Sequence, residues 1–190
     1  MRGLTEAGLE GGRVIIRPAT EEDASDVAAI YAHHVLGEGT FEEEAPDSEE
    51  MARRIASVIG SGLPYLVAEE SGTVLGFAYA APFRPRAAYR YTVENSVYVG
   101  ADHLRRGVGR ALLSAVLDAC TKLGMRQVIA AVGDSGNAPS LALHRSLGFV
   151  DDGVSRSVGF KNGRWLDVVW LRKPLNGGDS TWPDGPGQDL

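Results

Sequence analysis

The stretch from Val97 to Leu113 constrains the fold of this chain more than any other part of it. A β-branched and aromatic run leads into a turn rich in Arg and Gly, and the turn opens an amphipathic helix. The first N–H groups of such a helix have no partner inside it, so this end attracts an anion. Two glycines permit close approach to the backbone, and three arginines add positive charge. The turn, formed by Arg105, Arg106, Gly107, Val108, Gly109 and Arg110, is therefore predicted to bind a pyrophosphate.

Two common phosphate-binding motifs do not fit this turn. The Lys-Ser/Thr pair of a P-loop is missing, and the third position of a GxGxxG dinucleotide motif falls on Leu112. The turn is therefore neither a P-loop nor a GxGxxG dinucleotide site.

Composition favours one globular enzyme-sized domain. The chain has 190 residues, of which 44% are hydrophobic, enough for a single core without disulfides. A net charge of −6 argues against nucleic acid or an anionic membrane as partner. A soluble cytoplasmic protein is expected, because the sequence has neither a long apolar run nor a signal peptide. The single Cys120 fits a reducing compartment. His33, His34 and His103 show no ligand spacing with Asp, Glu or Cys, so no metal is expected.

Hydrophobic periodicity and turn residues predict the order β-α-α-β-β-β-α-β-α-β-β. Residues 1–12 are expected to be a flexible tail, 13–173 the domain, and 174–190 a disordered tail rich in Gly, Pro and Asp. Helix starts are expected near Thr20 and Ser48, after the Arg-rich turn, and at Asn137. Hairpins are expected at 71–72 and at Asn162-Gly163.

The Arg- and Gly-rich turn and three further motifs carry a resemblance to a known family. The turn resembles the Gln/Arg-x-x-Gly-x-Gly/Ala motif of the GCN5-related N-acetyltransferase (GNAT) superfamily, with Leu104 at the first position. The segments YRYTVENSVYV (89–99), NAPSLALHRSLGF (137–149) and VGFKNGRWLDV (158–168) are similar to the phosphinothricin and methionine sulfone/sulfoximine acetyltransferase branch. The resemblance covers roughly residues 13–173.

This resemblance implies a fold and an activity. The fold is α/β (α+β), a mixed and mostly antiparallel sheet of six to seven strands with about four helices. The activity is transfer of acetyl from acetyl-CoA, as co-substrate, to the α-amine of a small amino-acid-like substrate by direct attack in a ternary complex. The resemblance also places the backbone of Val97, Tyr98 and Val99 beside the pantetheine arm, and Asn137 and Ser140 beside the cofactor.

The chemistry needs a base for the amine and an acid for the leaving thiolate. Glu94 stands at the family's general-base position and shares a strand face with Thr92, Ser96 and Tyr98. His144 shares one helical face with Asn137 and Ser140. Much of the superfamily has a Tyr at this position, and that Tyr often serves as general acid toward the thiolate. It is a candidate general acid, or a residue that orients a neighbour or contacts the cofactor.

Six further residues are candidates for binding the amine substrate. Arg84 and Arg86 could bind a carboxylate or phosphinate, because a guanidinium forks onto such oxyanions. Thr40 and Phe41 resemble the family's other substrate-side loop. The resemblance also implies a homodimer, in which Phe160 and Lys161, together with Trp165, could wall the pocket from a second subunit. Packing of these residues within one chain is the alternative.

Two other functions remain open at this point. The chain could acetylate a peptide N-terminus or a protein lysine, which would need an open acidic groove. It could also be a non-catalytic acyl-CoA-binding module, although such a module has no use for a base at Glu94.

Overall fold

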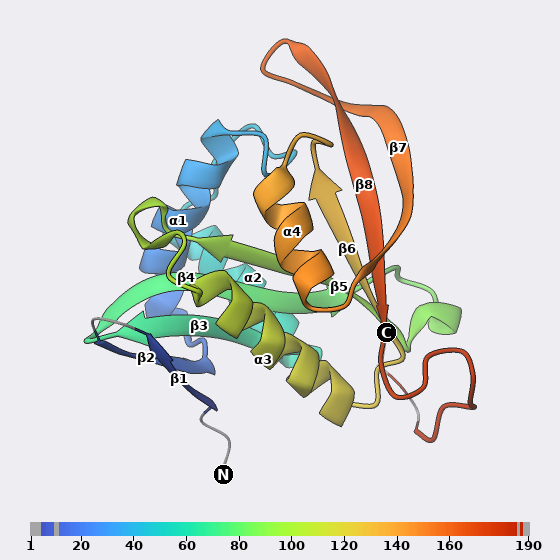
Figure 1. The fold of residues 1–190 in the computed structure, drawn as a ribbon. Helices are drawn as coiled ribbons and strands as arrows, with labels where there is room; N and C mark the ends of the chain where they lie inside the picture. The colour runs from blue at the N-terminus through green and yellow to red at the C-terminus, as the bar shows by residue number, and fades with distance from the viewer. Residues whose placement is uncertain (1–4, 10–11, 186, 188–190) are drawn as a thin grey trace.

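The computed structural model describes residues 5–9, 12–185 and 187. Its elements are β1 (Thr5–Leu9), β2 (Gly12–Pro18), α1 (Ala24–Leu36), α2 (Ser48–Gly60), β3 (Tyr65–Glu70), β4 (Thr73–Pro82), β5 (Thr92–Val99), α3 (Val108–Lys122), β6 (Gln127–Gly133), α4 (Ala138–Ser146), β7 (Val150–Lys161) and β8 (Arg164–Pro174). The strands form one sheet in the order β1-β2-β3-β4-β5-β6-β8-β7 (Figure 1). Every neighbouring pair is antiparallel except β5 and β6.

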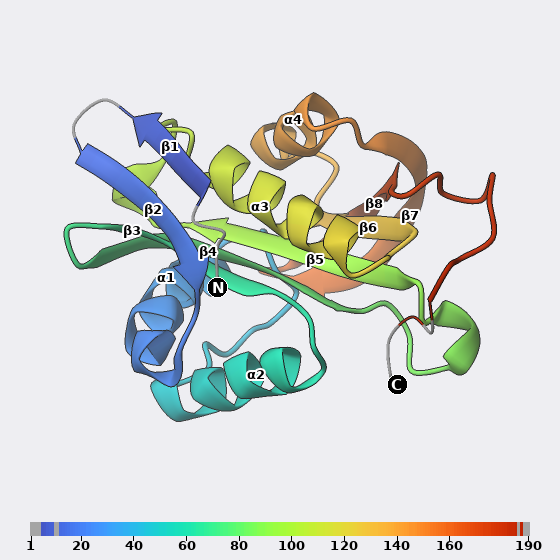
Figure 2. The ribbon, with the colours of Figure 1, turned by 90° about the horizontal axis from the view of Figure 1, so that it is seen from below.

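Helices cover both faces of the sheet. Helices α1 and α2 lie on one face, and α3 and α4 lie on the other (Figure 2). Each face has its own hydrophobic core. Leu112, Leu113 and Val116 of α3 are fully buried on one side, and Val27 of α1 and Ile55 of α2 are fully buried on the other. No helix among the described residues is long and apolar enough to cross a membrane.

Local sequence explains the ends of the helices and hairpins. Before α1, the Asp23 carboxylate accepts hydrogen bonds from the backbone N–H and the hydroxyl of Thr20. The left-handed Gly124, with φ of 76°, follows the end of α3, as the sequence predicts. Asn162 and Gly163 both have positive φ and form the predicted turn between β7 and β8.

The parallel pair β5 and β6 separates soon after it forms. Only Thr92, Val93 and Glu94 pair with β6, opposite residues 127–129. Beyond that point β5 continues along β4 while β6 continues along β8. The sheet therefore opens a wedge between its two halves, with the start of α3 on one side and α4 on the other.

The predicted mixed sheet with four helices is confirmed, and the seven strands β2–β8 have the expected order. The two tails are corrections. Residues 5–9 form strand β1 on β2 instead of a loose tail. At the other end, Leu175 is buried, and the buried Arg126 donates from Nε to the carbonyl of Gly178 at 2.8 Å and from Nη2 to that of Thr181. A buried guanidinium needs acceptors, and the segment expected to be disordered supplies them.

Candidate active site

The wedge between β5 and β6 contains a small cavity of about 50 Å³. Residues from three elements line it: β5 with Asn95 to Tyr98, β6 with Ala130 to Gly133, and α4 with its N-cap Asn137, Ser140 and His144. The Asn95 side-chain oxygen is buried there and has no hydrogen-bond partner among the described residues. Since a buried polar atom costs free energy when it is left unpaired, this wedge suits a ligand with polar groups.

The predicted pyrophosphate turn lies at the start of α3. Gly107 caps the helix with φ of 79°, a left-handed conformation that favours glycine. Gly109 also has a packing role. A Cβ at Gly109 would lie 3.3 Å from Val99 Cγ2 and 3.4 Å from Leu143 Cδ2, so this glycine lets the helix pack closely on β5 and α4. The N–H groups of the first helical turn remain available for an anion.

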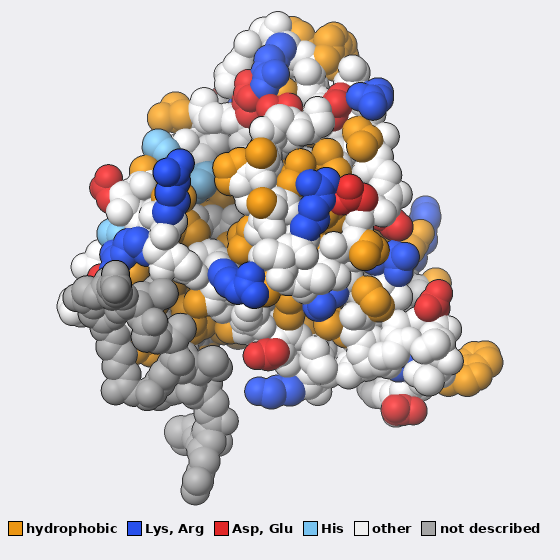
Figure 3. All heavy atoms as spheres, viewed as in Figure 1, with side chains coloured by type: hydrophobic (Ala, Val, Ile, Leu, Met, Phe, Trp, Pro, Cys, Tyr) orange, Lys and Arg blue, Asp and Glu red, His pale blue; other side chains and the backbone are white. Residues whose placement is uncertain are grey.

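The three arginines of the turn do not act alike. The guanidinium of Arg106 donates to both carboxylate oxygens of Glu70 at 2.9 Å, so its charge is paired within the protein. Arg110 donates to the Ser146 hydroxyl at 2.8 Å, which ties α3 to α4. Arg105 is exposed and has positive φ. Figure 3 shows Lys and Arg side chains on this face near the start of α3, which gives a local basic surface on an acidic protein.

Glu94 lies in a separate cleft of about 430 Å³ over β5 and β6. The same cleft is lined by Thr40 and Phe41 from the loop after α1, by Tyr79 of β4, and by Ser96 of β5. Burial raises the pKa of the Glu94 carboxyl, and the positive charge of Arg84, whose Nη1 lies 3.9 Å from Glu94 Oε2, acts in the opposite direction. The structure therefore brings Arg84 and Glu94 together, while Arg86 is exposed on the same loop.

His144 is almost fully buried, with 3% of its surface exposed. Its Nδ1 lies 2.8 Å from the Ser140 carbonyl oxygen, which can only accept, so Nδ1 carries the proton. Its Nε2 lies 3.0 Å from the Asn95 amide nitrogen, which donates to it. Burial lowers the pKa of His144, against the opposing hydrogen bond to Ser140. The imidazole is thus held neutral with its lone pair toward Asn95.

The α4 residues meet at the wedge as their spacing predicts. Asn137, Ser140 and His144 all line the small cavity. The Asn137 side chain also caps α4 by accepting from the Ser140 N–H at 3.3 Å. One residue thus both starts the helix and faces the candidate cofactor site.

Lys161 and Phe160, both expected to wall the substrate pocket from a second subunit, differ in exposure. Lys161 is 3% exposed, and its Nζ donates to the carbonyls of Val35 at 2.7 Å and Thr40 at 2.8 Å. Its ammonium binds backbone rather than substrate, because those carbonyls at the end of α1 and in the next loop need donors. Phe160 is 57% exposed and packs edge-to-face on Trp165 at 5.3 Å on the outer hairpin.

Sequence reasoning missed three residues of the site. Asn95 follows Glu94 but was not singled out, although alternation along β5 turns it toward His144. Tyr79 and Trp170 line the Glu94 cleft. The available signal was the period of two along each strand, which gives the face of a residue but not its neighbours on other strands.

Comparison with known proteins agrees with this geometry. Residues 16–170 match the model of the acetyltransferase (GNAT) domain family. A phosphinothricin N-acetyltransferase of Alcaligenes faecalis is 52% identical over 170 residues, covering 89% of this chain and 86% of that protein. An L-methionine sulfoximine/L-methionine sulfone acetyltransferase of Salmonella typhimurium is 36% identical over 85% of this chain and 94% of that protein. The crystal structure of a Sinorhizobium meliloti phosphinothricin acetyltransferase in complex with AcCoA superposes with a TM-score of 0.87 at 43% identity, covering 92% and 95% of the two chains.

Proposed function

The chain belongs to the GNAT acetyltransferase family, and we propose that it transfers acetyl from acetyl-CoA to the α-amine of a small amino-acid-like acceptor. Phosphinothricin, methionine sulfone and methionine sulfoximine are the acceptors that its relatives suggest. The observation that carries the proposal is the half-buried Glu94 carboxyl in a cleft beside the wedge between β5 and β6.

Glu94 is suited to take a proton from the acceptor's ammonium group. An amine attacks only after it loses a proton, and a carboxylate whose pKa is raised by burial is a stronger base than an exposed one. Arg84, next to Glu94, is placed to meet the carboxylate of an amino-acid acceptor. The two side chains would thereby hold the amine and the acidic group of one small molecule.

The wedge and the start of α3 support acetyl-CoA as the co-substrate. A thioester supplies an activated acetyl group, and its pyrophosphate would meet the N–H groups of the first turn of α3. The unpaired Asn95 oxygen and the polar groups of Asn137 and Ser140 line the space between these two points. Gly107 permits the backbone conformation that opens the turn.

Of the two roles considered for His144, the geometry supports orientation over acid catalysis. In the neutral ring, Nε2 accepts a hydrogen bond from Asn95 and has no proton to donate, while the proton on Nδ1 is bound to the Ser140 carbonyl. His144 would then hold Asn95 and α4 at the wedge, and water would protonate the thiolate.

The replacement of Glu94 by Gln tests the proposed base. Gln keeps the shape and removes the basicity, so kcat with methionine sulfone is expected to fall by ~10²–10⁴-fold. Calorimetry should show nearly unchanged acetyl-CoA affinity, and Glu49→Gln, an exposed change on α2, should leave kcat unaltered. Wild-type turnover in Glu94→Gln at neutral pH would remove this residue from the mechanism.

We extend the proposal to a cytoplasmic homodimer. Exposed apolar side chains support the dimer: Val150, Val154 and Val158 on β7, together with Phe160 and Trp165 at the hairpin, are each between 45% and 62% exposed. Several large exposed apolar side chains on one hairpin are typical of an interface.

A further inference from the structure

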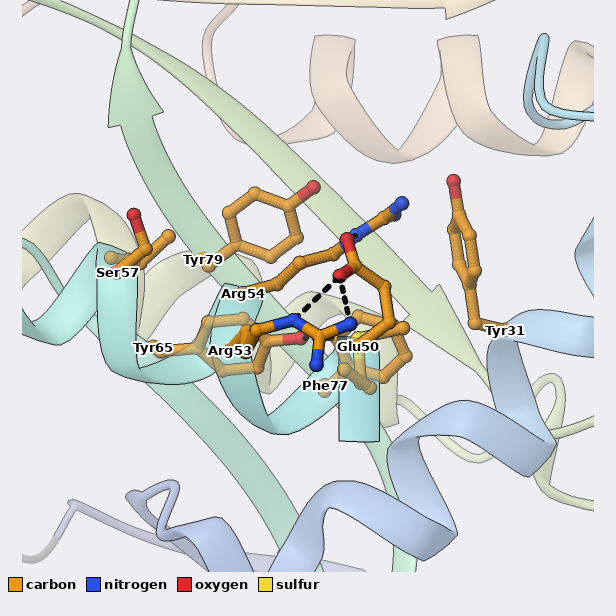
Figure 4. A pocket seen from close by; sticks show the side chains of 10 residues that line it. Tyr31, Glu50, Arg53, Arg54, Ser57, Tyr65, Phe77 and Tyr79 are labelled. Carbon is orange, nitrogen blue, oxygen red and sulfur yellow. Dashed lines mark hydrogen bonds and ion pairs between the residues drawn. The ribbon is translucent and has the colours of Figure 1, made fainter. Parts of the chain in front are cut away.

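A second cavity, of about 410 Å³, lies beneath α2. Four aromatic side chains form its inner wall: Tyr31 of α1, Tyr65 of β3, and Phe77 and Tyr79 of β4 (Figure 4). The Tyr65 and Tyr79 rings are stacked, with centroids 4.9 Å apart and planes inclined by 11°. We call this space the α2 cavity. The charged side chains of Glu50, Arg53 and Arg54 complete its lining, and its size is typical of sites for small organic ligands.

The α2 cavity adjoins the cleft that holds Glu94. Tyr79 lines both spaces. In the sheet, Tyr79 pairs with Ser96, and Ala81 pairs with Glu94, so Tyr79 and Glu94 are diagonal neighbours on adjacent strands. Such neighbours lie roughly 7–8 Å apart. An amino acid whose amine is at Glu94 could therefore reach the α2 cavity with its side chain.

An ion pair forms the rim where the two spaces meet. Arg54 lines the α2 cavity and donates to Glu42, which lines the Glu94 cleft, at 2.8 Å. The Tyr31 hydroxyl donates to the same Glu42 carboxylate at 2.9 Å. Both charged side chains are more than a third exposed, so the pair is weak enough to shift when a ligand enters.

Neither the base nor the candidate cofactor contacts need this space. The cofactor residues lie at the wedge between β5 and β6 and at the start of α3, whereas the α2 cavity lies over β3 and β4. Its aromatic wall would bury a hydrophobic side chain, while the Glu94 cleft, which carries Glu94 and Thr40 beside its own aromatic residues, holds the amine and the carboxylate.

We propose that the α2 cavity is a subsite for aromatic side chains of the acceptor, which lets the enzyme acetylate aromatic α-amino acids, whereas the polar side chain of methionine sulfone stays in the Glu94 cleft. The proposal rests on the proposed function, since it assumes an α-amine at Glu94. A phenyl or indole ring would pack against Tyr79 and Val58, which are partly exposed to the cavity, where aromatic contacts and burial from water both favour it.

A filling substitution on α2 tests this subsite. Ser57 is exposed on the helix surface and lines the cavity (Figure 4), so Ser57→Phe should occupy the space without disturbing the core. The wild type is expected to acetylate L-phenylalanine as well as L-methionine sulfone. Ser57→Phe should lower kcat/KM for L-phenylalanine by about tenfold or more and change that for methionine sulfone less than about twofold. Ala56→Phe, at the adjacent exposed position outside the cavity, is the matched control and should change neither.

The outcomes separate the subsite from the proposed function. If the wild type acetylates methionine sulfone but not L-phenylalanine, the subsite alone is overturned. An equal loss of kcat/KM for both acceptors in Ser57→Phe overturns it as well. A protein that acetylates neither of these acceptors nor phosphinothricin overturns the proposed function and the subsite with it, whereas acetylation of phosphinothricin alone overturns only the subsite. A crystal structure with CoA and L-phenylalanine gives a second test that needs no variant: the phenyl ring should lie against Tyr79 and Val58, and a ring placed elsewhere contradicts the proposal.

Discussion

Two adjacent residues on β5 have different places in the candidate active site. Successive side chains on a strand point to opposite faces, so Glu94 and Asn95 face different partners. Glu94 lies in the cleft beside Arg84, and Asn95 lies against His144 at the wedge. A shift of β5 by one residue would exchange these roles. The register of β5 on β4 is therefore as important for function as the identity of either residue.

At the residue scale, Arg84 is predicted to control the pH dependence of activity. Its positive charge lowers the pKa of Glu94 against the larger opposing effect of burial. Removing the charge in Arg84→Gln should raise the pKa of Glu94, so the acidic limb of the kcat/KM profile should move to higher pH. The readout is the midpoint of that limb, since loss of a substrate contact would change only its height. Arg90→Gln is the control, because this guanidinium lies over the Tyr91 ring. An unmoved or lowered midpoint in Arg84→Gln would show that the pair does not couple.

At the element scale, the β7–β8 hairpin holds the loop between α1 and α2 in place. Lys161 donates to two backbone carbonyls of that region, and Arg164 pairs with Glu38. The Phe41 ring packs directly on Gly159, where an added Cβ would lie 2.1 Å from Phe41 Cε1. The loop carrying Thr40 and Phe41 is thus shaped by a hairpin more than a hundred residues later in the chain.

This contact predicts a selective effect of Gly159→Ala. The added methyl must displace the Phe41 ring, so KM for the amine acceptor is expected to rise roughly tenfold or more while KM for acetyl-CoA stays the same. The double variant Gly159→Ala/Phe41→Leu should recover much of the loss, because Leu lacks the ring atoms that clash. Gly60→Ala, where a Cβ meets nothing within 4 Å, should behave as wild type. A rise in both KM values without recovery in the double variant would indicate general damage to the fold.

At the scale of the whole molecule, β7 is an edge strand with an exposed apolar surface. An edge of this kind is a natural place for pairing with another chain. Sedimentation of the wild type is expected to give about twice the chain mass of 20.2 kDa. Val158→Lys/Trp165→Lys should give a folded monomer, since both side chains are exposed and contribute little to the core. Lys122→Glu, on the far end of α3, serves as a control for surface charge. A wild type that sediments as a monomer at micromolar concentration contradicts the dimer.

The sequence predicted most of the elements, because their signals are local. The period of two from Val93 to Val99, the apolar stripe of α3 and the Asn-Gly turn each depend on residues near one another in the chain. For the same reason it predicted that Asn137, Ser140 and His144 share one face of α4. The tails were predicted less well, since Gly and Pro content shows the lack of a core but not the acceptors that a distant Arg126 requires.

What the sequence by itself determined was therefore the family, the helix start that suits a pyrophosphate, and the face on which Glu94 lies. Only the tertiary structure decided the partners of each side chain. In the folded protein Arg106 pairs with Glu70, Lys161 donates to backbone carbonyls, and His144 accepts from Asn95. The wedge and both larger cavities also form only in the tertiary structure. The physical reason is that the period of a strand or helix specifies the direction of a side chain, whereas a hydrogen bond or a cavity depends on register between segments that lie far apart in the chain.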